Sequence, residues 1–145
     1  MRQKDRKQEQ QQKIDLGFVE EFIRLNLSTE DGAKTARSII QDKLPKFISN
    51  LQGTKFTQVR KHYNYLLTIY LQTKKSNNYF YTQGQLKLGM GKVFAVYDKN
   101  RGHINEAFKE FLIKLYTSIK TPQELEKGKV LFEALIGYTK GKLKD

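Results

Sequence analysis

The chain has 145 residues, 38% of them hydrophobic and 12% aromatic, which suits one folded domain with a sizeable core. It has no cysteine, which excludes disulfide bonds and thiol chemistry. Its 27 Lys and Arg residues against 15 Asp and Glu give a formal net charge of +12. This excess indicates a polyanionic partner, either nucleic acid or an anionic membrane. No apolar run approaches the roughly 20 residues of a membrane span, and no signal peptide is evident, so a cytoplasmic location is expected.

The first 13 residues have a composition that differs from the rest. They contain five basic residues, two acidic residues and five glutamines, with no apolar residue after Met1. Such a segment cannot bury enough surface to offset the entropy of ordering it. We therefore expect a flexible basic tail at residues 1–13 and a single helical-bundle domain at residues 14–145.

Two helices are predicted in the first third of that domain. The first has apolar residues at helical spacing from residue 14 onward, namely Ile14, Phe18, Phe22 and Leu25. A break at residues 26–28 separates it from a second helix with the stripe Ala33, Ala36, Ile40 and Leu44. Pro45 then either kinks this helix or begins a short one, and Gly53 is the predicted stop.

The middle of the chain predicts two further helices. Thr54 or Thr57 is expected to cap the third helix, whose apolar stripe is Phe56, Val59, Tyr63, Leu66 and Tyr70. After a polar break at residues 74–78, a fourth helix follows with the stripe Leu86, Met90, Val93 and Tyr97. Asn100, Arg101 and Gly102 are typical of a turn.

The last part of the chain predicts two more helices. One carries the stripe Ile104, Phe108, Phe111 and Leu115. The final helix opens with Thr121 as cap, Pro122 in the first turn and Glu124 at the capping-box position, followed by the stripe Leu125, Phe132, Leu135 and Thr139. Because alternating β-branched runs are missing, we predict an all-α bundle of five or six helices.

The sequence shows no catalytic or cofactor motif. His62 and His103, the two histidines, have no metal-ligand spacing, and we interpret His62 as structural or solvated. Residues 84–92 contain glycines at phosphate-loop spacing, but Met90 stands where that loop needs lysine. We therefore expect a protein that is not an enzyme and that needs no metal and no cofactor.

Basic residues interleaved with Tyr and Asn form the candidate binding site. Lysine and arginine neutralise phosphates, while Asn and Tyr side chains hydrogen-bond phosphate or sugar oxygens. By helical spacing Lys61 points away from the apolar stripe of its helix, whereas Arg60 lies at its edge and is a candidate for a partly buried anchor. The candidate phosphate-contacting residues are Lys55, Arg60, Lys61, Lys92, Lys99 and Arg101. A further basic cluster at the C-terminus comprises Lys140, Lys142 and Lys144.

Two stretches resemble a known family, the small subunit of type III-A CRISPR effector complexes, or Csm complexes. One is residues 54–61, TKFTQVRK, where a threonine-containing cap leads into Gln, an aliphatic residue, Arg and a basic residue. The other is residues 132–140, FEALIGYTK, which resembles the closing helix of that family. Residues 86–102 are similar in placement to a family helix with basic and aromatic residues.

The resemblance implies a non-catalytic subunit of a larger complex. Several copies would stack along the duplex of guide RNA and target RNA and line its path through backbone contacts, while other subunits carry out the chemistry. Two alternatives stay open. The helix of residues 54–70 could read DNA bases through Gln58, Lys61 and Asn64 in a transcriptional regulator. In the second alternative, the chain is a protein–protein scaffold whose positive charge serves solubility or an acidic partner.

Overall fold

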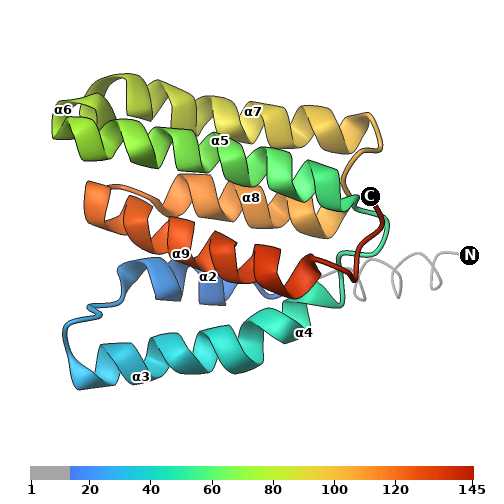
Figure 1. The fold of residues 1–145 in the computed structure, drawn as a ribbon, viewed down its shortest axis with the longest axis horizontal. Helices are drawn as coiled ribbons and strands as arrows, with labels where there is room; N and C mark the ends of the chain where they lie inside the picture. The colour runs from blue at the N-terminus through green and yellow to red at the C-terminus, as the bar shows by residue number, and fades with distance from the viewer. Residues whose placement is uncertain (1–13) are drawn as a thin grey trace, which may run out of the picture.

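The computed structural model describes residues 14–145, which form six continuous helical runs and no strand (Figure 1). The predicted all-α bundle is therefore confirmed, while the tail predicted at residues 1–13 lies outside the described residues. The elements are α2 (Gly17–Arg24), α3 (Glu30–Ser38), η1 (Ile39–Lys43), α4 (Leu44–Ile48), α5 (Phe56–Lys75), α6 (Asn77–Tyr79), η2 (Phe80–Gly84), α7 (Gln85–Asn100), α8 (Glu106–Ser118) and α9 (Pro122–Thr139). The labels η1 and η2 denote π-helical turns inside continuous runs.

The helices lie roughly along one direction in three tiers (Figure 1). Helices α5 and α7 form one outer tier, α8 and α9 the middle, and α2 with the α3–α4 run the other outer tier. Helix α9 packs against α2, α4 and α5, and α8 packs against α2 and α7. The two middle helices therefore contact both outer tiers, and their buried apolar side chains join the tiers into one core.

Phenylalanine rings form the centre of the core. The ring of Phe47 stacks on that of Phe111 with centroids 5.4 Å apart, and Phe111 contacts Phe132 edge-on at 5.7 Å. Phe108 and Phe18 extend the cluster at either side. Because these rings come from α2, α4, α8 and α9, one aromatic cluster joins four helices. Its rings from α2, α8 and α9 lie on apolar stripes predicted from the sequence.

Pro45 lies in the first turn of α4, which is one of its two predicted roles, and the helical run continues through it from Glu30 to Ile48. The π-turn η1 makes this possible. Leu44 donates its N–H to the Ile39 carbonyl, and Pro45 has no N–H to offer the carbonyl of Ile40. The Tyr138 hydroxyl donates to the Ile40 carbonyl at 2.9 Å, so a side chain of α9 satisfies it.

Two of the predicted helix boundaries were wrong. Neither Thr54 nor Thr57 caps α5: its N-cap residue is Lys55, which makes no capping bond. Thr54 instead accepts the N–H of Asn105 at 2.8 Å and so joins the start of α5 to the start of α8. Gly53, with φ of +95°, lies in the turn before α5, whereas the preceding helix already ends at Ile48.

The capping prediction for α9 is confirmed. The Thr121 hydroxyl accepts the N–H of Glu124 at 3.1 Å, and the Glu124 carboxylate accepts the N–H of Lys120 at 2.7 Å. Pro122 occupies the first turn. Side chains thus satisfy two backbone donors near the helix start, although Glu124 bonds to Lys120 and not, as in a standard capping box, to the N-cap residue Thr121.

The face that α7 turns to the core differs from the predicted one. Its predicted stripe points outward, with Leu86, Val93 and Tyr97 each more than half exposed, at 61%, 53% and 54%. The buried face consists of smaller or polar residues together with one leucine: Leu88, Gly91, Ala95 and Asp98. At Gly91 an added Cβ would lie 2.7 Å from the Tyr116 ring, so α7 approaches α8 too closely for a larger side chain.

Candidate nucleic-acid interface

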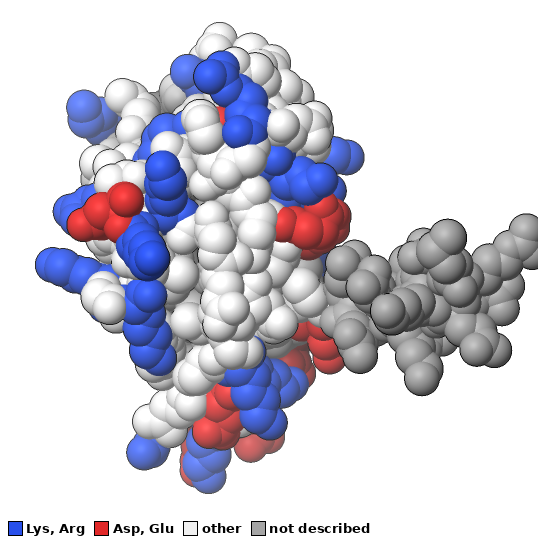
Figure 2. All heavy atoms as spheres, turned by 90° about the vertical axis from the view of Figure 1, so that its right-hand side faces the viewer, with Lys and Arg blue, Asp and Glu red and all other residues white. Residues whose placement is uncertain are grey.

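Basic residues from three distant parts of the sequence meet at one end of the bundle. Helix α5 begins and α7 ends at the end where the C-terminus lies (Figure 1). The Phe56 N–H donates to the Lys144 carbonyl at 2.8 Å, which fixes the C-terminal segment beside the start of α5. We call this region the cationic end, comprising Lys55, Arg60, Lys61, Lys99, Arg101, Lys140, Lys142 and Lys144. Figure 2 looks onto it and shows more Lys and Arg than Asp and Glu.

The charged side chains of Lys55 and Arg60 point into solvent. Both are exposed, and neither forms an ion pair within residues 14–145. The expectation that Arg60 is partly buried was wrong, because Val59 and His62 occupy the buried face of α5. The guanidinium of Arg60 therefore remains available to an anion in solution.

The other members that were predicted to contact phosphates make internal contacts. Lys61 pairs with Asp98 at 2.7 Å, and Lys99 pairs with Glu106 at 3.4 Å. The Arg101 guanidinium lies over the Tyr97 ring at 5.4 Å and donates to its hydroxyl at 2.6 Å. The partner of Arg101 is uncharged, whereas the charge of each of the two lysines is offset by a carboxylate.

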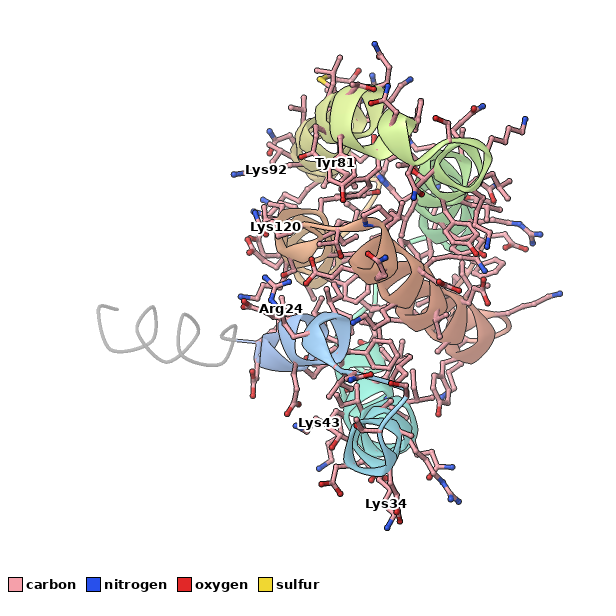
Figure 3. All side chains as sticks on the ribbon, turned by 90° about the vertical axis from the view of Figure 1, so that its left-hand side faces the viewer. Arg24, Lys34, Lys43, Tyr81, Lys92 and Lys120 are labelled. Atoms are coloured by element: carbon pink, nitrogen blue, oxygen red, sulfur yellow. The ribbon has the colours of Figure 1, made fainter. Side chains whose placement is uncertain are left out.

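Lys92 does not belong to the cationic end. It lies about two helical turns before Lys99 on α7 and is exposed. Figure 3, seen from the opposite end of the bundle, shows it on the same side of the molecule as Lys120 and Arg24. The sequence-based candidates are thus divided between one end of the bundle and its side.

Among residues 14–145, Asp98 is the one buried carboxylate, with a side chain only 4% exposed. Its Oδ2 lies 2.7 Å from both the Lys61 Nζ and the His62 Nε2. Burial raises the pKa of Asp98, but the hydrogen bonds from Lys61 and His62 outweigh burial and lower it. Burial lowers the pKa of His62, and the opposing effect of Asp98 does not restore it. At neutral pH we therefore expect a charged Asp98 and a neutral His62.

Sequence reasoning missed Asp98 because its partner His62 lies 36 residues away in the chain. The only signal was a lone acidic residue in a helix otherwise without acids. Within residues 14–145, no group of three or more His, Cys, Asp or Glu side chains is placed to hold a metal ion.

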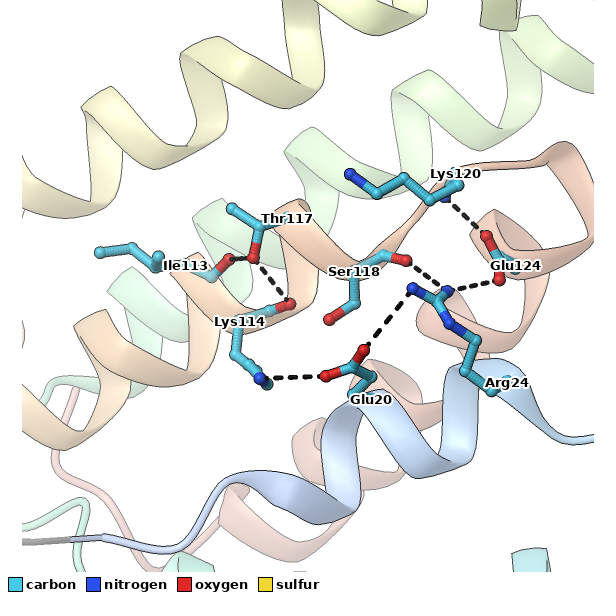
Figure 4. A network of polar contacts seen from close by, with 8 residues as sticks. All are labelled: Glu20, Arg24, Ile113, Lys114, Thr117, Ser118, Lys120 and Glu124. Carbon is cyan, nitrogen blue, oxygen red and sulfur yellow. Dashed lines mark hydrogen bonds and ion pairs between the residues drawn. The ribbon is translucent and has the colours of Figure 1, made fainter.

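The opposite end of the bundle combines charges of both signs. Arg24 of α2 bonds to Glu124 and to the Ser118 carbonyl, and Lys114 pairs with Glu20 at 3.1 Å (Figure 4). The pKa of Glu20 is lowered, chiefly by its hydrogen bond with Lys114. Arg24 and Lys114 are neutralised internally, so each offers an anion less than Lys55 or Arg60 does.

Within the described residues, every helix falls short of the length and apolarity that a membrane span requires. The fold and surface therefore define a small, basic, all-helical protein. Its sequence matches the family model described as Csm2 Type III-A over residues 33–144, from α3 to the C-terminal segment. The chain belongs to this family and is a small subunit of a type III-A CRISPR complex, which confirms the resemblance. No curated protein and no solved structure matches the chain.

Proposed function

We propose that this subunit is a non-catalytic RNA-binding protein that lines the path of the guide RNA and target RNA in a cytoplasmic type III-A complex. The observation that supports this proposal is the cationic end, where basic residues from the N-terminal turn of α5, the C-terminal turn of α7 and the C-terminal segment gather. Phosphate groups of an RNA backbone are the ligands that such a surface favours.

Sequence-independent binding fits the task of such a subunit. Base pairing between guide and target supplies the specificity, so the protein needs to recognise only charge and shape. Several copies stacked along the duplex would each hold a short stretch of backbone. The family relationship supports this arrangement, since it makes the chain one subunit among others in the complex.

The internal ion pairs support larger contributions from some of the proposed contacts than from others. Lys55, Arg60 and Arg101 make no ion pair within residues 14–145 and should contribute most to phosphate binding. The charges of Lys61 and Lys99 are offset by Asp98 and Glu106, so each lysine should contribute less to phosphate binding. Lys92 would contact the backbone separately, on the side of the bundle.

The proposal is tested by titrating the purified chain into labelled single-stranded RNA, a scrambled RNA and a duplex DNA, at low and near-physiological salt. Both RNAs should bind with similar affinity, which should fall steeply with salt. Arg60→Ala should lower the slope of log K against log salt by about one unit. Lys34→Ala is the matched control, because Lys34 pairs with Glu30 on α3, away from the cationic end.

Two outcomes would contradict the proposal. Unchanged affinity and salt slope in both Lys55→Ala and Arg60→Ala would remove the cationic end from RNA binding. Preference for one DNA sequence would favour a transcriptional regulator instead. The contacts of α5 give that alternative less support, because the Gln58 Oε1 atom is buried and Lys61 is held by Asp98.

A further inference from the structure

A groove of about 460 Å³ runs between α5 and α7 beside the cationic end. Its lining is mostly apolar and includes the rings of Tyr65, Phe94 and Tyr97, while Lys61 and Asn64 contribute polar groups. This volume lies within the range of small-ligand sites in proteins, so the groove suits a single planar group better than a whole helix.

The aromatic side chains of the groove are held in place yet remain accessible. Tyr65 contacts Phe94 edge-on, with centroids 5.5 Å apart, and donates its hydroxyl to the Lys87 carbonyl at 2.6 Å. Phe94 is 40% exposed and Tyr97 is 54% exposed, and Arg101 fixes the Tyr97 ring from one side. Pre-positioned, partly exposed rings beside cations are what nucleic-acid-binding proteins use to stack bases.

The polar groups of the groove are also compatible with an RNA ligand. The Asp98 carboxylate is satisfied by Lys61 and His62, so it does not present an unpaired negative charge to a phosphate. The side-chain amide of Asn64 makes no hydrogen bond to other residues between 14 and 145 and offers both a donor and an acceptor. Such an amide can pair with the edge of a nucleobase.

We infer that this groove binds an unpaired nucleobase of the RNA whose phosphates the cationic end holds. The inference rests on the proposed function and extends it from phosphate contacts to a base-binding site. A second copy of the chain fits less well, because α7 carries Lys87, Lys92 and Lys99 and its single acidic residue is the buried Asp98. Two such faces would repel each other.

The test compares two single-stranded RNAs of equal length and equal phosphate number, one with bases and one abasic. The full chain should bind the base-bearing RNA about tenfold more tightly, the effect of stacking one base. Phe94→Leu should remove this preference while keeping the salt slope, and Phe94→Tyr should restore it. Val93→Ala is the control on the outer face of the same helix.

Each other outcome overturns the inference in a distinguishable way. Equal, salt-dependent binding of both RNAs would leave the proposed function standing and exclude a base site. Failure to bind either RNA would overturn both proposals. If the chain sediments as a dimer that Phe94→Leu dissociates, with no change in base preference, the groove is instead a protein–protein interface.

Discussion

Helices α7 and α8 pack against each other, yet they present their large apolar side chains to opposite environments. In α8, Phe108, Phe111 and Leu115 are fully buried. In α7, Leu86 and Val93 point outward and are 61% and 53% exposed. The two helices have similar apolar spacing, so periodicity alone does not reveal which face of a helix meets the core.

The difference lies in what each helix brings to their contact. Helix α8 brings bulk, including the Tyr116 ring, and α7 brings the small residues Gly91 and Ala95, which let the two backbones approach closely. Apart from the buried Leu88, the large side chains of α7 are consequently left on its outer side and along the groove with α5. Because α7 packs through small residues, its apolar stripe of Leu86, Val93 and Tyr97 stays exposed on the surface.

The largest effect should come from removing bulk from α8. Phe111→Ala should lower the free energy of unfolding by about 3–5 kcal/mol, because it opens a cavity between α4, α8 and α9. Leu86→Ala on α7 should change it by less than about 0.5 kcal/mol, because that side chain is mostly exposed. Urea unfolding followed by circular dichroism measures both. Similar losses in the two variants would contradict the assigned faces.

Adding bulk to α7 tests the close approach. Gly91→Ala should destabilise the fold by about 1–3 kcal/mol, because its new methyl group would meet the Tyr116 ring. Gly89→Ala is the matched control two residues away, where nothing lies within 4 Å of an added Cβ. It should stabilise the helix by about 0.5–1 kcal/mol. Thermal unfolding of the pair should therefore shift in opposite directions.

The N-terminal ends of α7 and α8 also differ. Asn105 caps α8 by accepting the Phe108 N–H at 2.9 Å and donates to the Asn50 carbonyl at 2.7 Å, whereas α7 continues from a π-turn without a side-chain cap. Asn105→Ala should cost about 1–2 kcal/mol of unfolding free energy. Asn100→Ala, at the exposed end of α7, should stay within about 0.5 kcal/mol in the same denaturant titration. Equal effects would mean that the cap contributes nothing.

The smallest effect concerns pH, because α7 buries a charged residue and α8 does not. Burial lowers the pKa of His62, so below about pH 6.5 the unfolded chain binds a proton that the folded chain does not. Stability should therefore fall as the pH drops from 7 towards 5, with a slope of at most about 1.4 kcal/mol per unit for this group. His62→Gln should flatten the profile. An unchanged profile in His62→Gln would contradict the assignment.

The sequence predicted those features that depend on local patterns. Helices with one wide apolar stripe, such as α8, and caps such as Thr121 follow from neighbouring residues. The core face of α7 could not be predicted, because it depends on how closely Tyr116, some 25 residues later, approaches Gly91. The pairing of Lys61 with Asp98 also depends on how two helices pack, so it could not be predicted, although both residues lie in predicted helices.

The place of α9 has a consequence for how the protein is made. This helix is the last of the described helices to leave the ribosome, yet it packs against α2, α4 and α5 and its Tyr138 hydroxyl bonds to the Ile40 carbonyl in the second helical run. Until α9 emerges, the apolar faces that it covers stay exposed on the nascent chain. Folding is therefore expected to finish only after synthesis of the described helices, and incomplete chains should depend on chaperones to avoid aggregation.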